Sequence, residues 1–144
     1  MIEHYQHVSI TVSDLERSSA FYEDVLGFTP AETSEESGET ISQGIGVENV
    51  HLKLVTLTQG DCLLELIEYI SPQGRDEAPQ PCDVGCMHMA FEVDDIHGIY
   101  QEWSTRGVKF NSPPIRNPEG LSWAWWCYMR DPDGVPIELV QRAA

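Results

Sequence analysis

The chain has 144 residues, which is long enough for one compact domain with its own core over residues 1–144. Its 24 acidic and 8 basic side chains give a formal net charge of -16, which argues against nucleic acid and anionic membranes as partners, because both bind positive surfaces. No apolar run approaches the roughly 18 residues of a membrane span, and the first residues lack the features of a signal peptide, so we expect a cytoplasmic location.

The first half begins with a strand and a helix. Residues 7–12 alternate polar and apolar side chains, which is typical of a strand with one buried face. Asp14 stands just before a helical spacing of apolar residues, where its carboxylate can accept hydrogen bonds from the free N–H groups of the first turn. We expect this helix to end near Gly27, because glycine readily adopts the left-handed conformation that follows a helix.

Mostly extended chain follows this helix. Residues 31–48 are acidic and contain Gly and Ser, and they predict a mobile loop with a short strand. Residues 50–58 and 62–70 predict two strands, because both runs are rich in apolar and β-branched residues. The three residues between these runs form a compact hairpin turn.

A Pro-rich, polar stretch at about residues 71–84 is interpreted as a linker between a first module at about 4–70 and a second at about 85–142. Cys82 lies in this stretch and Cys86 follows it. No second pair of cysteines accompanies them, so a zinc knuckle is disfavoured. Four cysteines in a chain without a secretion signal indicate reduced thiols.

The second half of the chain repeats the first. When the sequence from His88 is aligned under the sequence from His7, Asp95 falls beneath Asp14, and helical spacing follows in both copies. A hairpin over residues 122–141, with the turn sequence DPDG, closes the second copy. The pattern predicts an α+β fold of two βαβββ modules in tandem.

Each module turns one histidine and one glutamate away from its apolar strand faces. Because alternate side chains of a strand point to opposite faces, His7 shares a face with Glu65, and His88 shares one with Glu138. Two imidazoles and two carboxylates suit a divalent metal ion such as Zn, Ni, Co, Mn or Fe(II). A glutamate on an inner strand face is costly unless it is paired or metal-bound, so the coincidence of all four favours one metal site.

Other histidines and acids fit this pattern less well. His4 and Glu68 fall on the opposite parity, and we expect Glu68 to end its strand in solvent. His97 lies on the second predicted helix, where we expect it to be exposed. His51 shares a face with Lys53 and remains an alternative ligand.

Four stretches carry a family resemblance: HVSITVSDLERSSAFYEDVLGF, LLELIEY, HMAFEVDDI and RDPDGVPIELVQ. Together they resemble the vicinal oxygen chelate superfamily, which includes glyoxalase I, methylmalonyl-CoA epimerase, fosfomycin-resistance enzymes, extradiol dioxygenases and bleomycin-binding proteins. The resemblance covers nearly the whole chain. It implies paired βαβββ modules that form a half-open barrel around a metal ion, usually completed in a homodimer.

The resemblance places the metal ligands at His7, Glu65, His88 and Glu138, and glutamate at both acidic positions looks like the ligand set of glyoxalase I. The implied activity is that of a metal-dependent lyase or isomerase, which enolises a small substrate bound through two neighbouring oxygens. Glu138 would be the catalytic base, and Glu65 its pseudo-symmetric catalytic partner.

Five residues are candidates for binding the substrate. Thr11 and Tyr69 stand where the bacterial glyoxalases resembled here place an Arg and an Asn that hold glutathione, so the resemblance gives glutathione less support. Lys53 is a basic residue available to the phosphates of a CoA thioester. Trp126 and Tyr128 would favour an apolar or aromatic acyl group if their strand face lines the cleft.

Two other functions remain open at this stage. An epimerase of the methylmalonyl-CoA type would exchange the α-proton of an acyl thioester with solvent. A binding protein of the bleomycin-resistance type would sequester its ligand without turnover and without metal. A dioxygenase fits less well, because its iron usually has one carboxylate ligand and more vacant positions.

Overall fold

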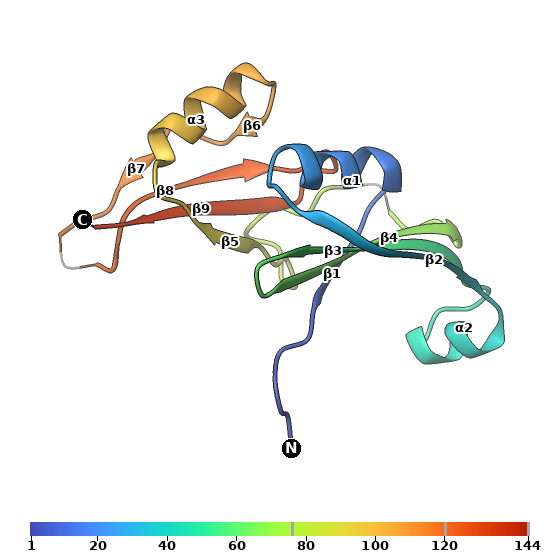
Figure 1. Ribbon diagram of the computed structural model, residues 1–144. Coiled ribbons are helices and arrows are strands. Elements are labelled where there is room, and N and C mark those ends of the chain that lie inside the picture. Colours follow the sequence, from blue (N-terminus) through green and yellow to red (C-terminus); the bar gives the residue numbers. More distant parts are fainter. Residues whose placement is uncertain (76, 120, 144) are drawn as a thin grey trace. The chain divides into compact units, whose positions relative to one another are not determined.

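The computed structural model describes residues 1–75, 77–119 and 121–143 (Figure 1). The chain divides into two compact units, residues 1–76 and 77–144. Each unit contains one sheet with parallel and antiparallel pairs, and the α+β class predicted from the sequence is confirmed. None of the helices in these described ranges is both long enough and apolar enough to cross a membrane.

The first unit contains a four-stranded sheet with the order β1-β4-β3-β2. Strand β1 runs parallel to β4, and the other neighbours are antiparallel. Its elements are β1 (Val8–Thr11), α1 (Leu15–Asp24), β2 (Thr29–Ser37), α2 (Glu39–Ile45), β3 (His51–Gln59) and β4 (Cys62–Ser71).

The second unit repeats this plan in a sheet with the order β5-β9-β8-β6, in which β7 also pairs with β8. Both β6 and β7 lie along one edge of β8, and Pro113 and Pro114 stand between them. Proline has no N–H for a strand ladder, which explains the interruption. The elements are β5 (Met89–Glu92), α3 (Ile96–Thr105), β6 (Lys109–Phe110), β7 (Ile115–Arg116), β8 (Trp123–Arg130) and β9 (Pro136–Arg142). With β6 and β7 counted as one interrupted strand, and the short helix α2 as an insertion, both units are βαβββ modules, as predicted.

The helix starts also follow the sequence prediction. The side chain of Asp14 accepts a hydrogen bond from the N–H of Arg17 at 2.9 Å, at the start of α1. The side chain of Asp95 accepts one from the N–H of Gly98 at 2.9 Å, at the start of α3. Both aspartates therefore satisfy a donor that the first turn leaves free.

A second acceptor at each helix start was not expected. The Oε2 atom of Glu68 accepts from the N–H of Leu15 at 3.0 Å, and the Oε1 atom of Gln141 accepts from the N–H of Ile96 at 2.9 Å. The expectation that Glu68 ends its strand in solvent is therefore wrong. Its carboxylate lies at the positive end of α1, which favours a negative charge.

Residues 31–48 also differ from the expected loop. Strand β2 runs for nine residues, and α2 follows it directly. Almost all of β2 is exposed, and its polar residues show no alternation with apolar ones. Its backbone pairs with β3 from Thr29 to Ser37, so the ladder, and not a buried face, stabilises this edge strand.

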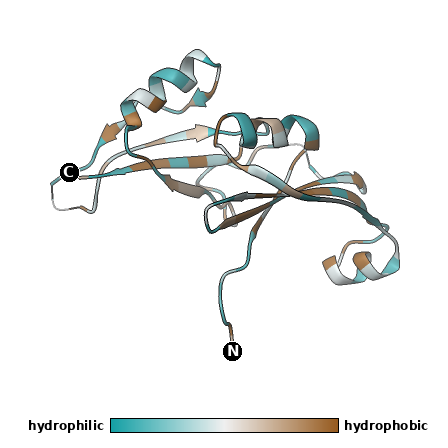
Figure 2. Cartoon of the chain, viewed as in Figure 1, coloured by the Kyte–Doolittle hydropathy of each residue, from teal (hydrophilic) through white to brown (hydrophobic). Residues whose placement is uncertain are grey.

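Each unit buries the apolar face of its sheet beneath its long helix. Helix α1 contacts β3 and β4, and α3 contacts β6 and β9. Figure 2 shows hydrophobic residues concentrated on the strands, whereas the helices mix both kinds. The fully buried side chains include Tyr22, Leu57, Leu64 and Leu66 in the first unit, and Ile96, Cys127, Met129, Ile137 and Leu139 in the second. The opposite face of each sheet carries polar side chains such as Glu65 and Glu138, together with apolar ones such as Leu52 and Val140.

Candidate metal centre

In the first unit, β1 and β4 bring His7 and Glu65 together. The Nε2 atom of His7 lies 3.3 Å from the Oε2 atom of Glu65. Ser9, two residues after His7, pairs with Glu65 in the parallel ladder, and its hydroxyl donates a hydrogen bond to the same Oε2 at 2.8 Å. The Nδ1 atom of His7 contacts the side-chain oxygen of Gln6.

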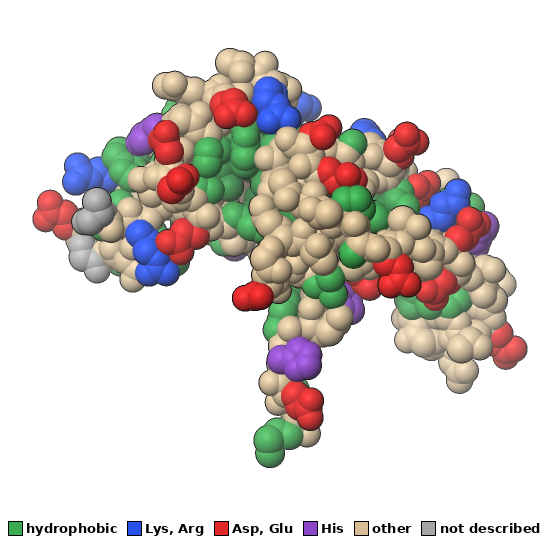
Figure 3. All heavy atoms as spheres, viewed as in Figure 1, with side chains coloured by type: hydrophobic (Ala, Val, Ile, Leu, Met, Phe, Trp, Pro, Cys, Tyr) green, Lys and Arg blue, Asp and Glu red, His purple; other side chains and the backbone are tan. Residues whose placement is uncertain are grey.

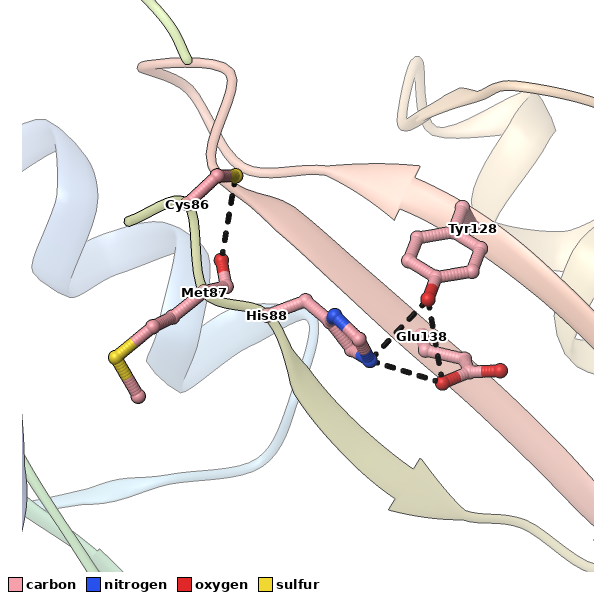
Figure 4. Close-up of polar contacts among 5 residues, drawn as sticks. All are labelled: Cys86, Met87, His88, Tyr128 and Glu138. Atoms are coloured by element: carbon pink, nitrogen blue, oxygen red, sulfur yellow. Dashed lines mark hydrogen bonds and ion pairs between the residues drawn. The ribbon is translucent and has the colours of Figure 1, made fainter. Parts of the chain in front are cut away.

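The second unit builds the same pair from β5 and β9 (Figure 4). The Nε2 atom of His88 lies 3.2 Å from the Oε2 atom of Glu138. Ala90, two residues after His88, pairs with Glu138 in the parallel ladder. From the antiparallel strand β8, the hydroxyl of Tyr128 lies 3.2 Å from Nε2 of His88 and donates to Oε2 of Glu138 at 3.4 Å.

The spacing of each pair fits two ligands of one metal ion. An imidazole nitrogen and a carboxylate oxygen, each about 2.1 Å from an ion at right or tetrahedral angles, lie about 3.0 to 3.4 Å apart. Both observed distances, 3.3 Å and 3.2 Å, fall in this interval. Within the described residues, no three or more His, Cys, Asp or Glu side chains gather closely enough to hold a metal ion. Each unit taken by itself therefore supplies two candidate ligands.

Both pairs are accessible to a ligand from solvent. The side chains of His7 and His88 are 38% and 45% exposed, and those of Glu65 and Glu138 are 25% and 20% exposed. Burial raises the pKa of Tyr128, and the charge of Glu138 and its hydrogen bond raise it further. Tyr128 is therefore a neutral phenol at neutral pH and can donate to the carboxylate.

Four of the five candidate substrate residues lie on the sheet faces that carry the pairs. Thr11 follows His7 by an even number of residues, and Tyr69 follows Glu65 by an even number. Both therefore lie on the sheet face of the His7–Glu65 pair. Tyr128 pairs with Glu138 directly, and Trp126 lies two residues before it. The rings of Trp126 and Tyr128 meet edge to face, with their centroids 6.0 Å apart.

The fifth candidate, Lys53, lies on the other face of its sheet. It pairs with Glu68 on β4 and with Glu35 on β2. Glu68 is an odd number of positions from Glu65 on β4, so Lys53 and Glu68 share one face and Glu65 lies on the other. The structure therefore does not bring Lys53 to the His7–Glu65 pair. The charge of Lys53 instead helps to lower the pKa of Glu35.

His51, the alternative ligand, forms a separate pair. Its Nε2 atom lies 2.6 Å from the Oε1 atom of Glu35, and this hydrogen bond is the main cause that holds the pKa of Glu35 below its usual value. His97 is exposed on α3, as expected, and its ring meets that of Trp125 at a centroid distance of 4.6 Å. Among the described residues, His51 forms an ion pair with Glu35 alone, and neither His51 nor His97 belongs to a group of three possible metal ligands.

Sequence reasoning missed how Ser9 and Tyr128 contact the two glutamates. Ser9 could have been found, because it has the same strand parity as His7. The contacts of Tyr128 required the register of β8 against β9, which places it opposite Glu138.

Comparison with known proteins agrees with the repeated module. Residues 4–139 match the family model of the glyoxalase/bleomycin resistance protein/dioxygenase superfamily. The chain belongs to this superfamily. A crystal structure of a glyoxalase family protein from Bacillus cereus has the same fold, with a TM-score of 0.86 at 18% identity over 100% of this chain and 97% of that one.

Relatives within the superfamily are distant in sequence. The uncharacterized protein YaeR of Escherichia coli is 27% identical over 98% of both chains. A 2-epi-5-epi-valiolone epimerase from Actinomyces is 28% identical over 96% of this chain and 79% of its own length. Superfamily relatives at 26% and 28% identity also include a human mitochondrial methylmalonyl-CoA epimerase and a lactoylglutathione lyase of Haemophilus influenzae. The relatives thus include epimerases and a lyase.

Proposed function

We propose that the protein is a divalent-metal-dependent lyase or isomerase of the glyoxalase I type. The observation that carries this proposal is the repetition of one His–Glu pair, at one register and one spacing, in both units. The proposed ligand set is His7, Glu65, His88 and Glu138. A divalent ion bound there would supply a Lewis acid that polarises two neighbouring oxygens of a small substrate.

The chain's own contribution is to hold and move a proton. We assign Glu138 as the base that takes the proton from the carbon beside the polarised carbonyl. Glu65 occupies the equivalent register position. It would donate a proton taken up from solvent, either to the neighbouring carbon or to the other face of the same carbon, while Glu138 releases its proton to solvent. The hydroxyl of Tyr128 donates to Oε2 of Glu138, and the hydroxyl of Ser9 donates to Oε2 of Glu65. Each hydroxyl would orient its glutamate.

An epimerase is the second candidate, and the two epimerases among the relatives favour it. Both reactions begin with removal of a proton next to a carbonyl, so they share the proposed residues. They differ in whether the proton returns to the same carbon.

We further propose that the protein acts as a cytoplasmic homodimer. Sedimentation equilibrium of the purified protein would test the dimer.

Elemental analysis of the purified protein tests the proposed centre. We expect about one divalent ion per chain, lost on His7→Ala, Glu65→Gln, His88→Ala and Glu138→Gln. His51→Ala is the matched control, because it removes a histidine from another His–Glu pair and should leave the metal content unchanged. A wild-type protein that stays metal-free after incubation with these ions would exclude the enzyme and favour a ligand-sequestering protein.

Exchange of substrate protons with deuterated solvent tests the chemistry. The metal-loaded protein should catalyse exchange or conversion of a hemithioacetal if it is a lyase, and exchange of the α-proton of an acyl-CoA thioester if it is an epimerase. Glu138→Gln should abolish either reaction. Metal binding without exchange in any such substrate would contradict the enolisation mechanism.

A further inference from the structure

A row of hydrogen-bond donors adjoins the His88–Glu138 pair on the same face of the second sheet. Arg130 follows Tyr128 by two residues on β8, so both side chains point to the face of Glu138. Across the outer edge, Lys109 pairs with Arg130, and the N–H of Asn111 bonds to the carbonyl of Tyr128 at 2.8 Å. Paired residues share a sheet face. Two cationic side chains therefore lie on the sheet face that carries the proposed base.

The guanidinium of Arg130 is held in place by neutral groups. Its Nη1 donates to the carbonyl of Gly134 at 2.8 Å, and its Nε donates to the side-chain oxygen of Asn111 at 3.4 Å. A guanidinium carries five N–H donors, so the remaining ones are available to a ligand. No ion pair of Arg130 with a carboxylate is found in the described chain. Its charge is therefore fixed but not neutralised.

This is unusual in a chain with 24 acidic and 8 basic residues, whose carboxylates are spread over the surface seen in Figure 3. Arg142 also lies on this face, two residues beyond Val140, but its Nε pairs with Glu92 at 2.6 Å. Its guanidinium also stacks on Trp123, 4.7 Å from the ring centroid. Arg142 is therefore already occupied, in contrast to Arg130.

Among the described residues, the equivalent strand positions of the first unit carry no such cations. Opposite Glu65 stands Thr56, where the second unit has Tyr128, and Thr56 pairs in turn with Glu32. Thr58 corresponds to Arg130 and pairs with Thr29, where the second unit has Lys109. The equivalent sheet faces of the two units thus differ in charge.

We propose that Arg130 and Lys109 form a subsite that binds an oxyanion of the substrate, a carboxylate or a phosphate, beside Glu138. Arg130 supplies the forked donor and Lys109 a second positive charge. The proposal rests on the proposed function, since it assigns the anionic end of a substrate whose reacting carbon faces Glu138. It fixes the orientation of that substrate, with the anion over β6 and β8 of the second unit.

Hydroxamates test this subsite, because the hydroxamate group chelates a metal ion through two neighbouring oxygens. The probes are butyrohydroxamate, whose tail is neutral, succinic monohydroxamate, whose tail ends in a carboxylate, and 3-phosphonopropionohydroxamate, whose tail ends in a phosphonate. Titration calorimetry on the metal-loaded protein should show about 10- to 100-fold tighter binding of at least one anionic probe than of the neutral one. The tighter of the two identifies carboxylate or phosphate.

The variants separate the subsite from the metal centre. Arg130→Gln should abolish the advantage of the anionic probe and leave butyrohydroxamate affinity unchanged, and Lys109→Gln should reduce the advantage in part. Arg116→Gln is the matched control, because Arg116 pairs with Trp125 on the other face and should have no effect. Equal binding of all three probes by the wild-type protein would overturn the subsite alone. Failure of every hydroxamate to bind would instead overturn the proposed open metal centre.

Discussion

Tyr128 donates a hydrogen bond to Glu138 across the β8–β9 ladder, with 3.4 Å between the two oxygens. The same hydroxyl lies 3.2 Å from Nε2 of His88, so one side chain touches both proposed ligands of the second unit. Groups that orient metal ligands in this way typically strengthen metal binding.

Tyr128→Phe should therefore weaken metal binding by about 10- to 100-fold, measured by competition with a coloured chelator. The substitution keeps the aromatic ring and removes only the hydroxyl. Ser9→Ala is the matched change in the first unit, where the hydroxyl bonds to Glu65 at 2.8 Å, and it should weaken binding as well. Unchanged affinity in both variants would show that neither hydroxyl orients a ligand.

The pair of His51 and Glu35 predicts a pH dependence away from the proposed centre. The hydrogen bond from His51 lowers the pKa of Glu35, so His51→Ala should raise that pKa towards its usual value, as followed by carboxyl NMR titration. The pKa of Glu35 is lower in the folded than in the unfolded chain. The ionised carboxylate therefore stabilises the folded protein above the unfolded-state pKa, and this contribution is lost as the pH falls through the folded-state pKa. Acid unfolding of His51→Ala should lack this contribution. Lys53→Gln removes a smaller cause and should shift the pKa of Glu35 less.

Cys127 should resist thiol reagents in the folded protein. It is fully buried, and burial together with the charge of Glu138 raises its pKa to about 11. The reactive thiolate is therefore scarce at neutral pH. Cys82 is exposed and serves as the comparison. A coloured disulfide reagent should label Cys82 rapidly and Cys127 only after unfolding, which single Cys→Ser variants will distinguish. Rapid labelling of Cys127 in the native protein would contradict its burial.

Glu68 should stabilise the start of α1. Its carboxylate accepts from the N–H of Leu15 at 3.0 Å, so Glu68→Ala should lower the free energy of unfolding by about 1 kcal/mol. Glu68→Gln keeps an acceptor and should cost less, as Gln141 shows by making the equivalent bond to Ile96 at 2.9 Å. Urea denaturation measures both. Equal stability of the Ala and Gln variants would mean that the bond contributes nothing.

The sequence was sufficient to pair each histidine with its glutamate, because strand alternation has a strict period of two and the module occurs twice. It was not sufficient for Lys53. Around it, Leu52, Leu54, Val55 and Leu57 occupy both parities, so the alternation does not say which face is buried. The structure buries Leu52, Val55 and Leu57, with a register shift between His51 and Leu52. An irregularity of this kind has no signature in a single sequence.

Strand β2 was missed for a different reason. Its residues are polar on both faces, and what stabilises it is the backbone ladder to β3, a partner distant in sequence. The contacts of Tyr128 likewise depend on which residue of β8 faces which residue of β9. The local sequence pattern predicts where strands and helices lie and which strand face is buried. Which residues stand opposite each other on neighbouring strands depends on the strand register, which the local pattern does not give.

The interrupted outer strand of the second sheet has a consequence for solubility. An unpaired strand edge is a template on which another chain can add a strand and start aggregation. In this sheet the edge of β8 is covered by two-residue strands on either side of Pro113 and Pro114, which have no N–H to offer an incoming chain. The long edge of β2 is protected in another way, by exposed carboxylates such as Glu35 and Glu36. These two strand edges thus discourage aggregation by strand addition.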